Sequence, residues 1–252
     1  MIHFVGAGPG AVDLITVRGQ KLLKEADVII YAGSLVNPQL LQERKANCEV
    51  YDSAYMTLEE VIAVMEQAEC QGKETVRLHT GDPSIYGAIR EQMDLLEQKG
   101  ITYESCPGVS SFCGAAAALN MEYTLPGISQ SVILTRMEGA TKVPEGEQLE
   151  KLAAHHTTMV LFLSTGMLSQ LAEKLIAGGY AANTPAALVY KATWPEEKKI
   201  IATLETLPKL AREAGISKTA LIIVGNVVGK SGYEKSRLYA ADFSTAYRKA
   251  SK

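Results

Sequence analysis

The sequence predicts an α/β protein with two α/β domains, the first built on a mainly parallel sheet and the second on a mixed sheet. Short apolar runs alternate with segments of helical apolar spacing through the first half of the chain. The apolar run Thr75–Leu78 leads directly into the tight turn Thr80–Gly87, which carries the Asp82 carboxylate. Such a turn is typical of the carboxyl edge of an open α/β sheet, where ligands bind. A Pro-Gly pair at Pro126–Gly127 then marks a change in character.

The elements of the first half follow from apolar spacing and from capping signals. Thr57, followed three residues later by Glu60, forms a capping box that begins a helix at Leu58. Pro107-Gly108 turns the chain into an alanine-rich helix. The expected strands are 2–5, 27–31, 75–78 and 101–105, and the expected helices are 16–26, 58–68, 89–96 and 111–119. This β-α-β rhythm predicts parallel strands with helices on both faces of the sheet.

The second half is richer in strands. The expected strands are 129–137, 158–163, 186–190, 199–203 and 221–224, and the expected helices lie near 148–154, 167–177 and 207–214. Trp194-Pro195 lies just before the fourth of these strands, which indicates a hairpin. We therefore expect an N-terminal domain at 1–120, a C-terminal domain at 121–230 and a polar tail at 231–252.

Composition excludes several classes of function. The chain has 252 residues, of which 47% are hydrophobic and 21% charged, as is usual for a soluble globular protein. Its net charge of −3 gives no bulk basic field for nucleic acid. No apolar run approaches the ~20 residues of a membrane helix, and the N-terminus is typical of a strand rather than a signal peptide. The four cysteines lack Cys-x-x-Cys spacing, and His155-His156 lacks further ligands, so we expect reduced thiols, no metal site and a cytoplasmic protein.

The segment Gly6–Ala11 matches the G-x-G-x-x-G/A pattern of dinucleotide-binding proteins. Three details oppose that interpretation. Pro9 lacks the N–H group that would bind a pyrophosphate, and the next helix is delayed until about Thr16. Asp27 opens the second strand, whereas a ribose-binding acid should close it. We prefer a loop that lines a cleft, followed by a purely structural tight turn, with dinucleotide binding third.

Four segments in order along the chain resemble the tetrapyrrole methylase family: Val5–Gly10, Thr80–Pro83, Pro107–Ser111 and Ala220–Gly225. Five further segments are similar to the subgroup that methylates C11 of cobalt-precorrin-4 in corrin biosynthesis: Tyr31–Pro38, Asp52–Leu58, Ser129–Arg136, Ala192–Pro195 and Ser236–Tyr239. The segment Gly139–Pro144 departs from that subgroup, because it lacks an arginine and a proline expected at positions 140 and 142. There, Lys142 is a candidate substitute for the arginine.

The resemblance implies a homodimeric enzyme that binds S-adenosyl-L-methionine and a tetrapyrrole in a cleft between its domains. The implied methyl-donor contacts are Pro9, Gly81, Asp82, Ile85, Ser110, Ser111, Leu163, Ala192 and Ala220. Candidate acceptor contacts are Gly8, Gly10, Tyr55, Met56 and Arg136, and Asp52 is the candidate for handling a proton. Plainer roles stay open for Asp82 as an Asx turn, for Ser110 and Ser111 as helix caps, and for Met56 as a core residue.

Other functions also remain open. Within the family, the methylated position could be C17 or C20, or the substrate could be uroporphyrinogen III. Outside it, the alternatives are a nicotinamide-dependent dehydrogenase and a ligand-binding module without catalysis. The subgroup segments around Asp52 and Trp194 favour C11, and Pro9 counts against the dehydrogenase.

Overall fold

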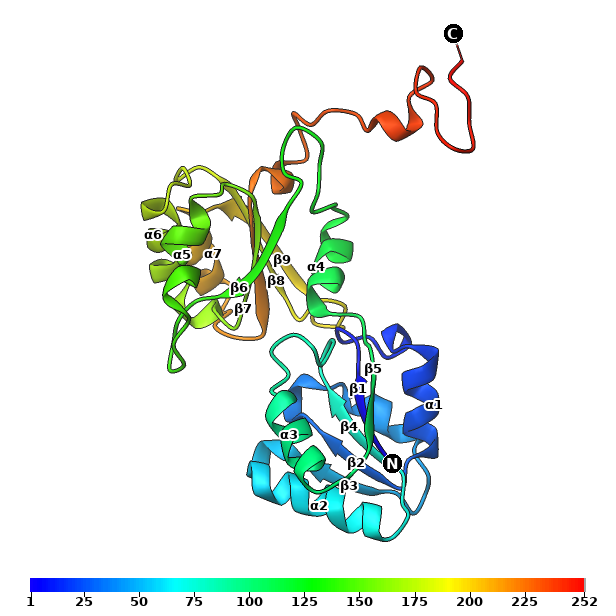
Figure 1. Ribbon diagram of the computed structural model, residues 1–252. Coiled ribbons are helices and arrows are strands. Elements are labelled where there is room, and N and C mark those ends of the chain that lie inside the picture. The colour runs from blue at the N-terminus through cyan, green and yellow to red at the C-terminus, as the bar shows by residue number, and fades with distance from the viewer. Residues whose placement is uncertain (252) are drawn as a thin grey trace. The chain divides into compact units, whose positions relative to one another are not determined.

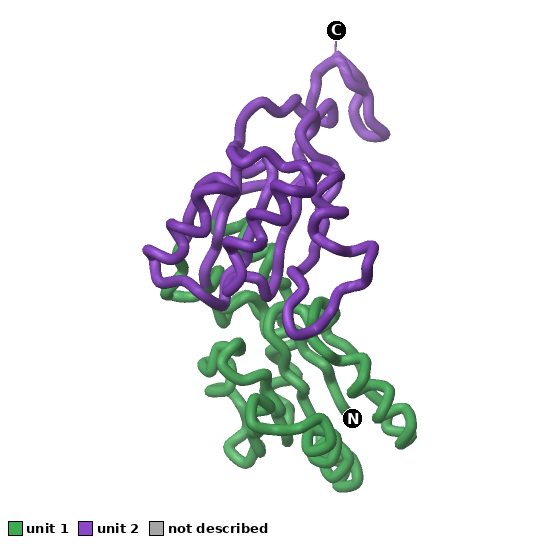
Figure 2. Tube along the Cα trace, turned by 90° about the vertical axis from the view of Figure 1, so that its left-hand side faces the viewer, with its two compact units in different colours: residues 1–118, 191–198 green, residues 119–190, 199–252 purple. Residues whose placement is uncertain are grey.

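The chain forms two compact units in a computed structural model that describes residues 1–251. The first unit comprises Met1–Ala118 together with Lys191–Lys198, and the second comprises Leu119–Tyr190 together with the residues from Lys199 onward (Figure 2). Each unit has its own five-stranded sheet. The predicted fold class is therefore confirmed.

The sheet of the first unit is parallel throughout, with the strand order β3-β2-β4-β1-β5. Its strands are β1 (Ile2–Gly6), β2 (Val28–Tyr31), β3 (Glu49–Asp52), β4 (Thr75–His79) and β5 (Tyr103–Cys106). Sequence analysis missed β3, which is a half-exposed edge strand of 4 residues without a continuous apolar run. Because all five strands point the same way, the turns that follow them lie along one edge of the sheet.

Helices cover both faces of this sheet, as predicted. The helices are α1 (Val17–Glu25), α2 (Leu58–Cys70), α3 (Arg90–Gln98) and α4, which begins in this unit (Ser111–Leu119). Alternate residues of β1 serve the two faces: Phe4 packs in the core under α2 and α3, whereas Val5 packs in the core with α1. The predicted capping box at the start of α2 is present, with both the Thr57 and the Glu60 hydrogen bonds formed.

The second unit has a mixed sheet with the order β6-β7-β10-β8-β9. Its strands are β6 (Val132–Arg136), β7 (Thr158–Phe162), β8 (Pro185–Tyr190), β9 (Lys198–Thr203) and β10 (Ala220–Val224). Strand β6 is parallel to β7, and β10 is antiparallel to both of its neighbours. The helices α5 (Leu149–Ala153), α6 (Leu168–Ala177) and α7 (Leu207–Glu213) pack on one face of the sheet (Figure 1).

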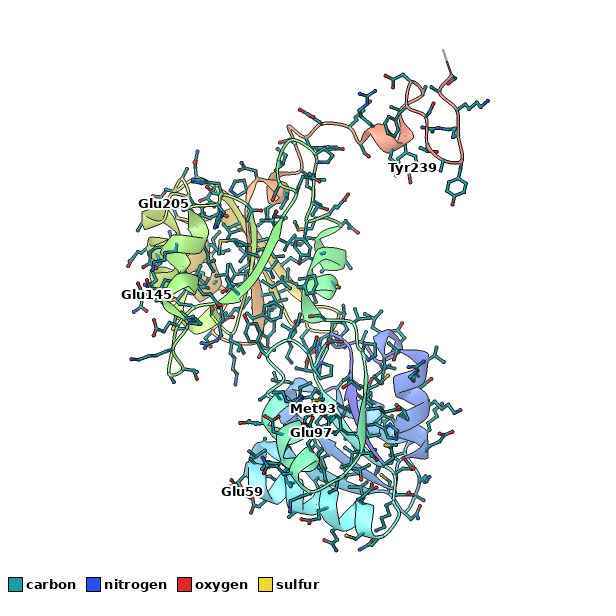
Figure 3. The ribbon with its side chains drawn as sticks, in the orientation of Figure 1. Glu59, Met93, Glu97, Glu145, Glu205 and Tyr239 are labelled. Carbon is teal, nitrogen blue, oxygen red and sulfur yellow. The ribbon has the colours of Figure 1, made fainter. Side chains whose placement is uncertain are left out.

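Two segments connect to these sheets in ways that matter below. The segment Lys191–Lys198, which connects β8 to β9 and includes the first residue of β9, belongs to the first unit, although the rest of both strands belongs to the second. From Lys230 onward the chain is a largely exposed tail, on which Tyr239 is 81% exposed (Figure 3). Over residues 1–251, every helix is too short or too polar to span a bilayer.

Candidate functional site

Three glycines bring the turns after β1, β4 and β5 into direct backbone contact. A Cβ atom added to Gly6 would lie 2.5 Å from Gly108 Cα and 2.6 Å from the Gly81 carbonyl oxygen. Any side chain at Gly6 or Gly108 would therefore force these backbones apart. A pair of hydrogen bonds adds to this contact, because the Gly81 amide donates to the Gly8 carbonyl (2.8 Å) and the Gly8 amide donates to the Gly81 carbonyl (3.2 Å).

The Asp82 carboxylate ties the β4 turn to the β5 turn. Its Oδ1 accepts hydrogen bonds from the Ser84 amide (2.9 Å) and the Ser84 hydroxyl, which is the Asx turn that the sequence left open. Its Oδ2 accepts a hydrogen bond from the Gly108 amide (2.8 Å), a partner 26 residues away. Partial burial acts to raise the pKa of Asp82, but the hydrogen bonds from Ser84 and Gly108 outweigh it and hold the pKa below its usual value.

Gly81 lies against the beginning of α4. Its φ of +60° favours glycine, and a Cβ placed there would contact the Ser111 nitrogen at 3.4 Å and Ser110 Cα at 3.5 Å. The Ser110 carbonyl accepts a hydrogen bond from the Gly114 amide (3.3 Å), which places Ser110 at the position just before the first turn of α4. The structure thus gathers most of the predicted methyl-donor contacts of the first unit: Pro9, Gly81, Asp82, Ser110 and Ser111.

Side chains from distant segments hold the turn Gly8–Gly10. The Asn37 amide donates to the Gly10 carbonyl (2.8 Å), and the Trp194 indole N–H donates to the Pro9 carbonyl (3.1 Å). The Thr193 hydroxyl accepts from the Ala11 amide (3.0 Å). Sequence analysis missed all three side chains as site residues, although all three lie in the subgroup segments.

The turn Gly8–Gly10 lacks two features of a dinucleotide site among residues 1–251: a helix that begins directly at the glycines, and an acid at the end of the second strand. A short 3-10 helix (Val12–Leu14) follows the glycines, and α1 begins only at Val17. Asp27 precedes β2, where it pairs with Lys45 (2.7 Å) and accepts from the Glu74 amide (3.0 Å). It lies at the amino edge of the sheet, away from the glycine turn, which confirms the argument against dinucleotide binding.

Asp52 lies at the carboxyl end of β3 beside Tyr31 of β2. The Tyr31 hydroxyl donates to Asp52 Oδ2 (3.1 Å), and the Ala54 amide donates to Oδ1 (2.9 Å). Burial, followed by the hydrogen bond to Asp52, raises the pKa of Tyr31. Of the two neighbouring candidates, Tyr55 is 88% exposed, whereas Met56 packs against the core under α2 and α3. The structure supports a core role for Met56.

Exposed apolar side chains follow successive strands along this carboxyl edge. They are Val12 (38% exposed), Leu14 (36%), Leu35 (44%), Tyr55 (88%) and Tyr86 (46%). We call these five residues the apolar rim. A group of exposed large apolar residues near polar turns is characteristic of a ligand-binding surface.

Five other predicted contacts take no part in the contact between the three glycines. In the second unit, Leu163 is 68% exposed with a φ of +53°, and the Ala220 carbonyl accepts from Thr165 Oγ1 (3.0 Å). The Arg136 guanidinium donates to the carbonyls of Thr141 and Lys142, both at 3.0 Å, so it holds the loop that follows β6. In the first unit, Ile85 is half-buried in the turn after β4. Ala192 is 7% exposed and directly precedes Thr193.

Strand β4 carries buried polar side chains beneath its turn. Arg77 is 6% exposed and donates to Gln92 Oε1 (3.1 Å) and the Ile30 carbonyl (3.2 Å). His79 is 4% exposed and stacks on Phe4 with 6.3 Å between ring centroids. Burial, with a smaller contribution from the charge of Arg77, lowers the pKa of His79 to about 3. No group of three metal-ligating side chains exists among residues 1–251.

Comparison with known proteins gives a consistent result. The family model for tetrapyrrole (corrin/porphyrin) methylases matches residues 1–208. A Methanocaldococcus jannaschii relative named cobalt-precorrin-4 C(11)-methyltransferase is 54% identical, covering 100% of this chain and 97% of the relative. The solved structure of a cobalt precorrin-4 methyltransferase superposes with a TM-score of 0.88 at 47% identity, covering 90% of this chain and 95% of that one. A Thermus thermophilus uroporphyrin-III C-methyltransferase complexed with S-adenyl homocysteine has a TM-score of 0.75 at 27% identity, covering 90% and 92%.

Proposed function

Because the chain belongs to the tetrapyrrole (corrin/porphyrin) methylase family, we propose that it methylates C11 of cobalt-precorrin-4 to give cobalt-precorrin-5A in corrin ring biosynthesis. S-adenosyl-L-methionine is the methyl donor. The observation that carries the proposal is the 54% identity to a cobalt-precorrin-4 C(11)-methyltransferase over essentially the whole length of both chains. Family membership leaves no support for the dehydrogenase or for a module without catalysis.

The turn after β4 and the start of α4 support a donor site in the first unit. Gly81 has no Cβ, so a ligand can approach its backbone closely. Ser110 and Ser111 supply hydroxyl and amide groups at a helix N-terminus. Each Asp82 oxygen has two lone pairs, so Oδ2 can accept from a ribose hydroxyl or an amino group while it holds the Gly108 amide. Donor contacts at Leu163 and Ala220 of the second unit stay predictions.

The apolar rim supports binding of a flat macrocycle beside the Gly8–Gly10 turn. Its exposed Tyr55 ring and the aliphatic side chain of Leu35 offer surface that a tetrapyrrole face would remove from water. Gly8 and Gly10 let the acceptor approach the backbone. Binding of substrate carboxylates by Arg136 or Lys142 stays a prediction, and the bonds that Arg136 makes to its own loop limit how far its guanidinium can reach.

The proposed reaction is an in-line displacement at the sulfonium methyl group by a nucleophilic carbon of the macrocycle. The residues of the chain contribute chiefly by positioning the two substrates and by excluding water. Asp52 is the proposed proton-handling group, because it lies at the same sheet edge and its Oδ2 is held in place by Tyr31. Asp52→Asn, which keeps the size and one acceptor oxygen for the Ala54 amide, should lower kcat with little change in donor affinity.

The experiment is to incubate the purified protein with methyl-labelled S-adenosyl-L-methionine and cobalt-precorrin-4, and to locate the new methyl group by NMR. Label at C11 supports the proposal. Label at another carbon would reassign the protein within the family. In a parallel reaction with uroporphyrinogen III, transfer to that substrate alone would reject the C11 assignment. Cobalt-free precorrin-4 in a parallel reaction decides whether cobalt is required.

Family membership also supports a homodimer that works in the cytoplasm. Light scattering coupled to size-exclusion chromatography tests the oligomeric state, with a mass of twice 27.1 kDa expected. A single-chain mass at working concentration would reject the homodimer.

A further inference from the structure

The connection Lys191–Lys198 contains unusually strained backbone. Lys191 has a φ of +45° and Thr193 a φ of +70°, although neither is glycine. For a β-branched residue such as threonine, a positive φ is a genuine outlier. Strain of this kind persists only where surrounding contacts fix the conformation, and it concentrates at functional sites.

Those surrounding contacts are present. The Thr193 amide donates to Glu197 Oε2 (2.7 Å), and the Trp194 amide donates to the Lys191 carbonyl (3.0 Å). The Lys191 ammonium lies 5.1 Å from the centroid of the Trp194 ring and pairs with Glu196 at 3.2 Å. These contacts hold the connection in its strained conformation. We refer to residues Lys191–Glu197 as the hook.

The hook grips three consecutive residues of the N-terminal turn. Pro9 has no amide hydrogen, so its carbonyl is its only backbone hydrogen-bonding group, and the Trp194 indole takes it. A Cβ on Gly10 would overlap the indole ring, so Gly10 is required for the ring to lie where it does. The Ala11 amide donates to Thr193 Oγ1. The hook thus supplies two of the hydrogen bonds that hold this turn, beside those from Asn37 and Gly81.

We propose that Thr193 and Trp194 are positioning residues that set the place of the acceptor macrocycle and thereby the carbon that receives the methyl group. Neither side chain has to touch a substrate for this role. Each acts through Pro9, Gly10 or Ala11 of the turn whose Gly8 and Gly10 are the proposed acceptor contacts, so the inference rests on the proposed function. A shift of about 1 Å in such a wall can cost about 10²-fold in rate.

The decisive variants keep shape and remove one hydrogen bond. Trp194→Phe keeps a ring against Gly10 but loses the N–H donor to Pro9. Thr193→Val keeps the branched shape but loses the acceptor for Ala11, and Thr193→Ser restores the hydroxyl. Val61→Ala, in α2 at 4% exposure, is the comparator, because it weakens the core of the same unit away from the turn.

The measurements are kcat, KM for the acceptor, affinity for S-adenosylhomocysteine, melting temperature and the position of the new methyl group. We expect Trp194→Phe and Thr193→Val to lower kcat by roughly 10–100-fold and to place part of the label on carbons other than that used by the wild type. Donor-product affinity should change less than threefold, and Thr193→Ser should recover most of the rate.

The proposal is overturned if both variants keep kcat within twofold of wild type with an unchanged product. It is equally overturned if Val61→Ala, at the same loss of melting temperature, lowers kcat as much and scatters the label as well. If the wild type fails to methylate cobalt-precorrin-4, the function is reassigned, and the same ratios are measured with the tetrapyrrole that it does methylate.

Discussion

The two glycine turns of the first unit are stabilised in opposite ways. The β4 turn carries its own carboxylate, and Asp82 fixes it through Ser84 and Gly108. The Gly8–Gly10 turn contains no side chain able to hydrogen-bond, and Asn37, Thr193 and Trp194 hold it from other segments. The turn proposed to hold the donor thus carries a side chain that fixes it, whereas the turn proposed to hold the acceptor is fixed by side chains of distant segments.

The largest effect should come from removing the glycine contact that both turns share. Gly108→Ala puts a methyl group against the Gly6 backbone at 2.7 Å and onto the Gly81 carbonyl. We expect a loss of at least about 3 kcal/mol in the free energy of unfolding, measured with urea. Gly146→Ala is the control, since nothing lies within 4 Å of the added carbon. Equal stability of the two variants would show that the turns do not depend on this contact.

A smaller effect should follow when the β4 turn loses its carboxylate. Asp82→Ala leaves the Gly108 and Ser84 amides without their acceptor, which costs about 2–3 kcal/mol of stability. It should also weaken S-adenosylhomocysteine binding at least tenfold by calorimetry. Asp82→Asn keeps one acceptor oxygen, so its stability and its affinity for S-adenosylhomocysteine should lie between those of the wild type and of Asp82→Ala. Unchanged affinity for Asp82→Ala would remove this residue from the donor site.

Acid should destabilise the end of β4, because His79 is 4% exposed there and a charged imidazole is costly to bury. The His79 backbone carbonyl accepts the Ala7 amide (2.7 Å), so this strand end supports both turns. The pKa of His79 is about 3 when folded and about 6.5 when unfolded. Between these values only the unfolded chain binds the proton, so stability is complete above pH 6.5 and falls as the pH drops. At pH 5 the loss is about 2 kcal/mol. Between pH 8 and pH 5, His79→Gln should therefore lose about 2 kcal/mol less of its unfolding free energy than the wild type does. Parallel plots of stability against pH for the two proteins would contradict this.

The smallest effect is expected where Tyr31 meets Asp52, outside both turns. Tyr31→Phe removes one donor to Asp52 Oδ2 and should cost about 1 kcal/mol of stability. If Asp52 handles a proton, Tyr31→Phe should lower kcat more than Val61→Ala does for the same loss of stability. A variant with wild-type kcat would leave Asp52 as a turn residue, with the Ala54 amide as its partner.

How much could be predicted from the sequence follows the same division. The Thr57 capping box, the strand-to-turn pattern at Asp82 and the alanine-rich helix after Gly108 are local, so their residues reveal them. The contacts that hold the Gly8–Gly10 turn are not local, because 185 residues separate Trp194 from Pro9 and 27 separate Asn37 from Gly10. Spacing carries no signal for such pairs. The edge strand β3 escaped prediction because half-exposed residues show no apolar run.

Trp194 is the single tryptophan of the chain. Its indole is half-buried, donates to the Pro9 carbonyl and lies beneath the Lys191 ammonium, so its excited state senses a hydrogen bond and a charge that belong to one turn. Fluorescence excited at a wavelength that only indole absorbs therefore reports on the Gly8–Gly10 turn alone, because the 11 tyrosines are not excited there. The unmodified protein thus contains an optical probe for the proposed binding of a macrocycle beside the Gly8–Gly10 turn.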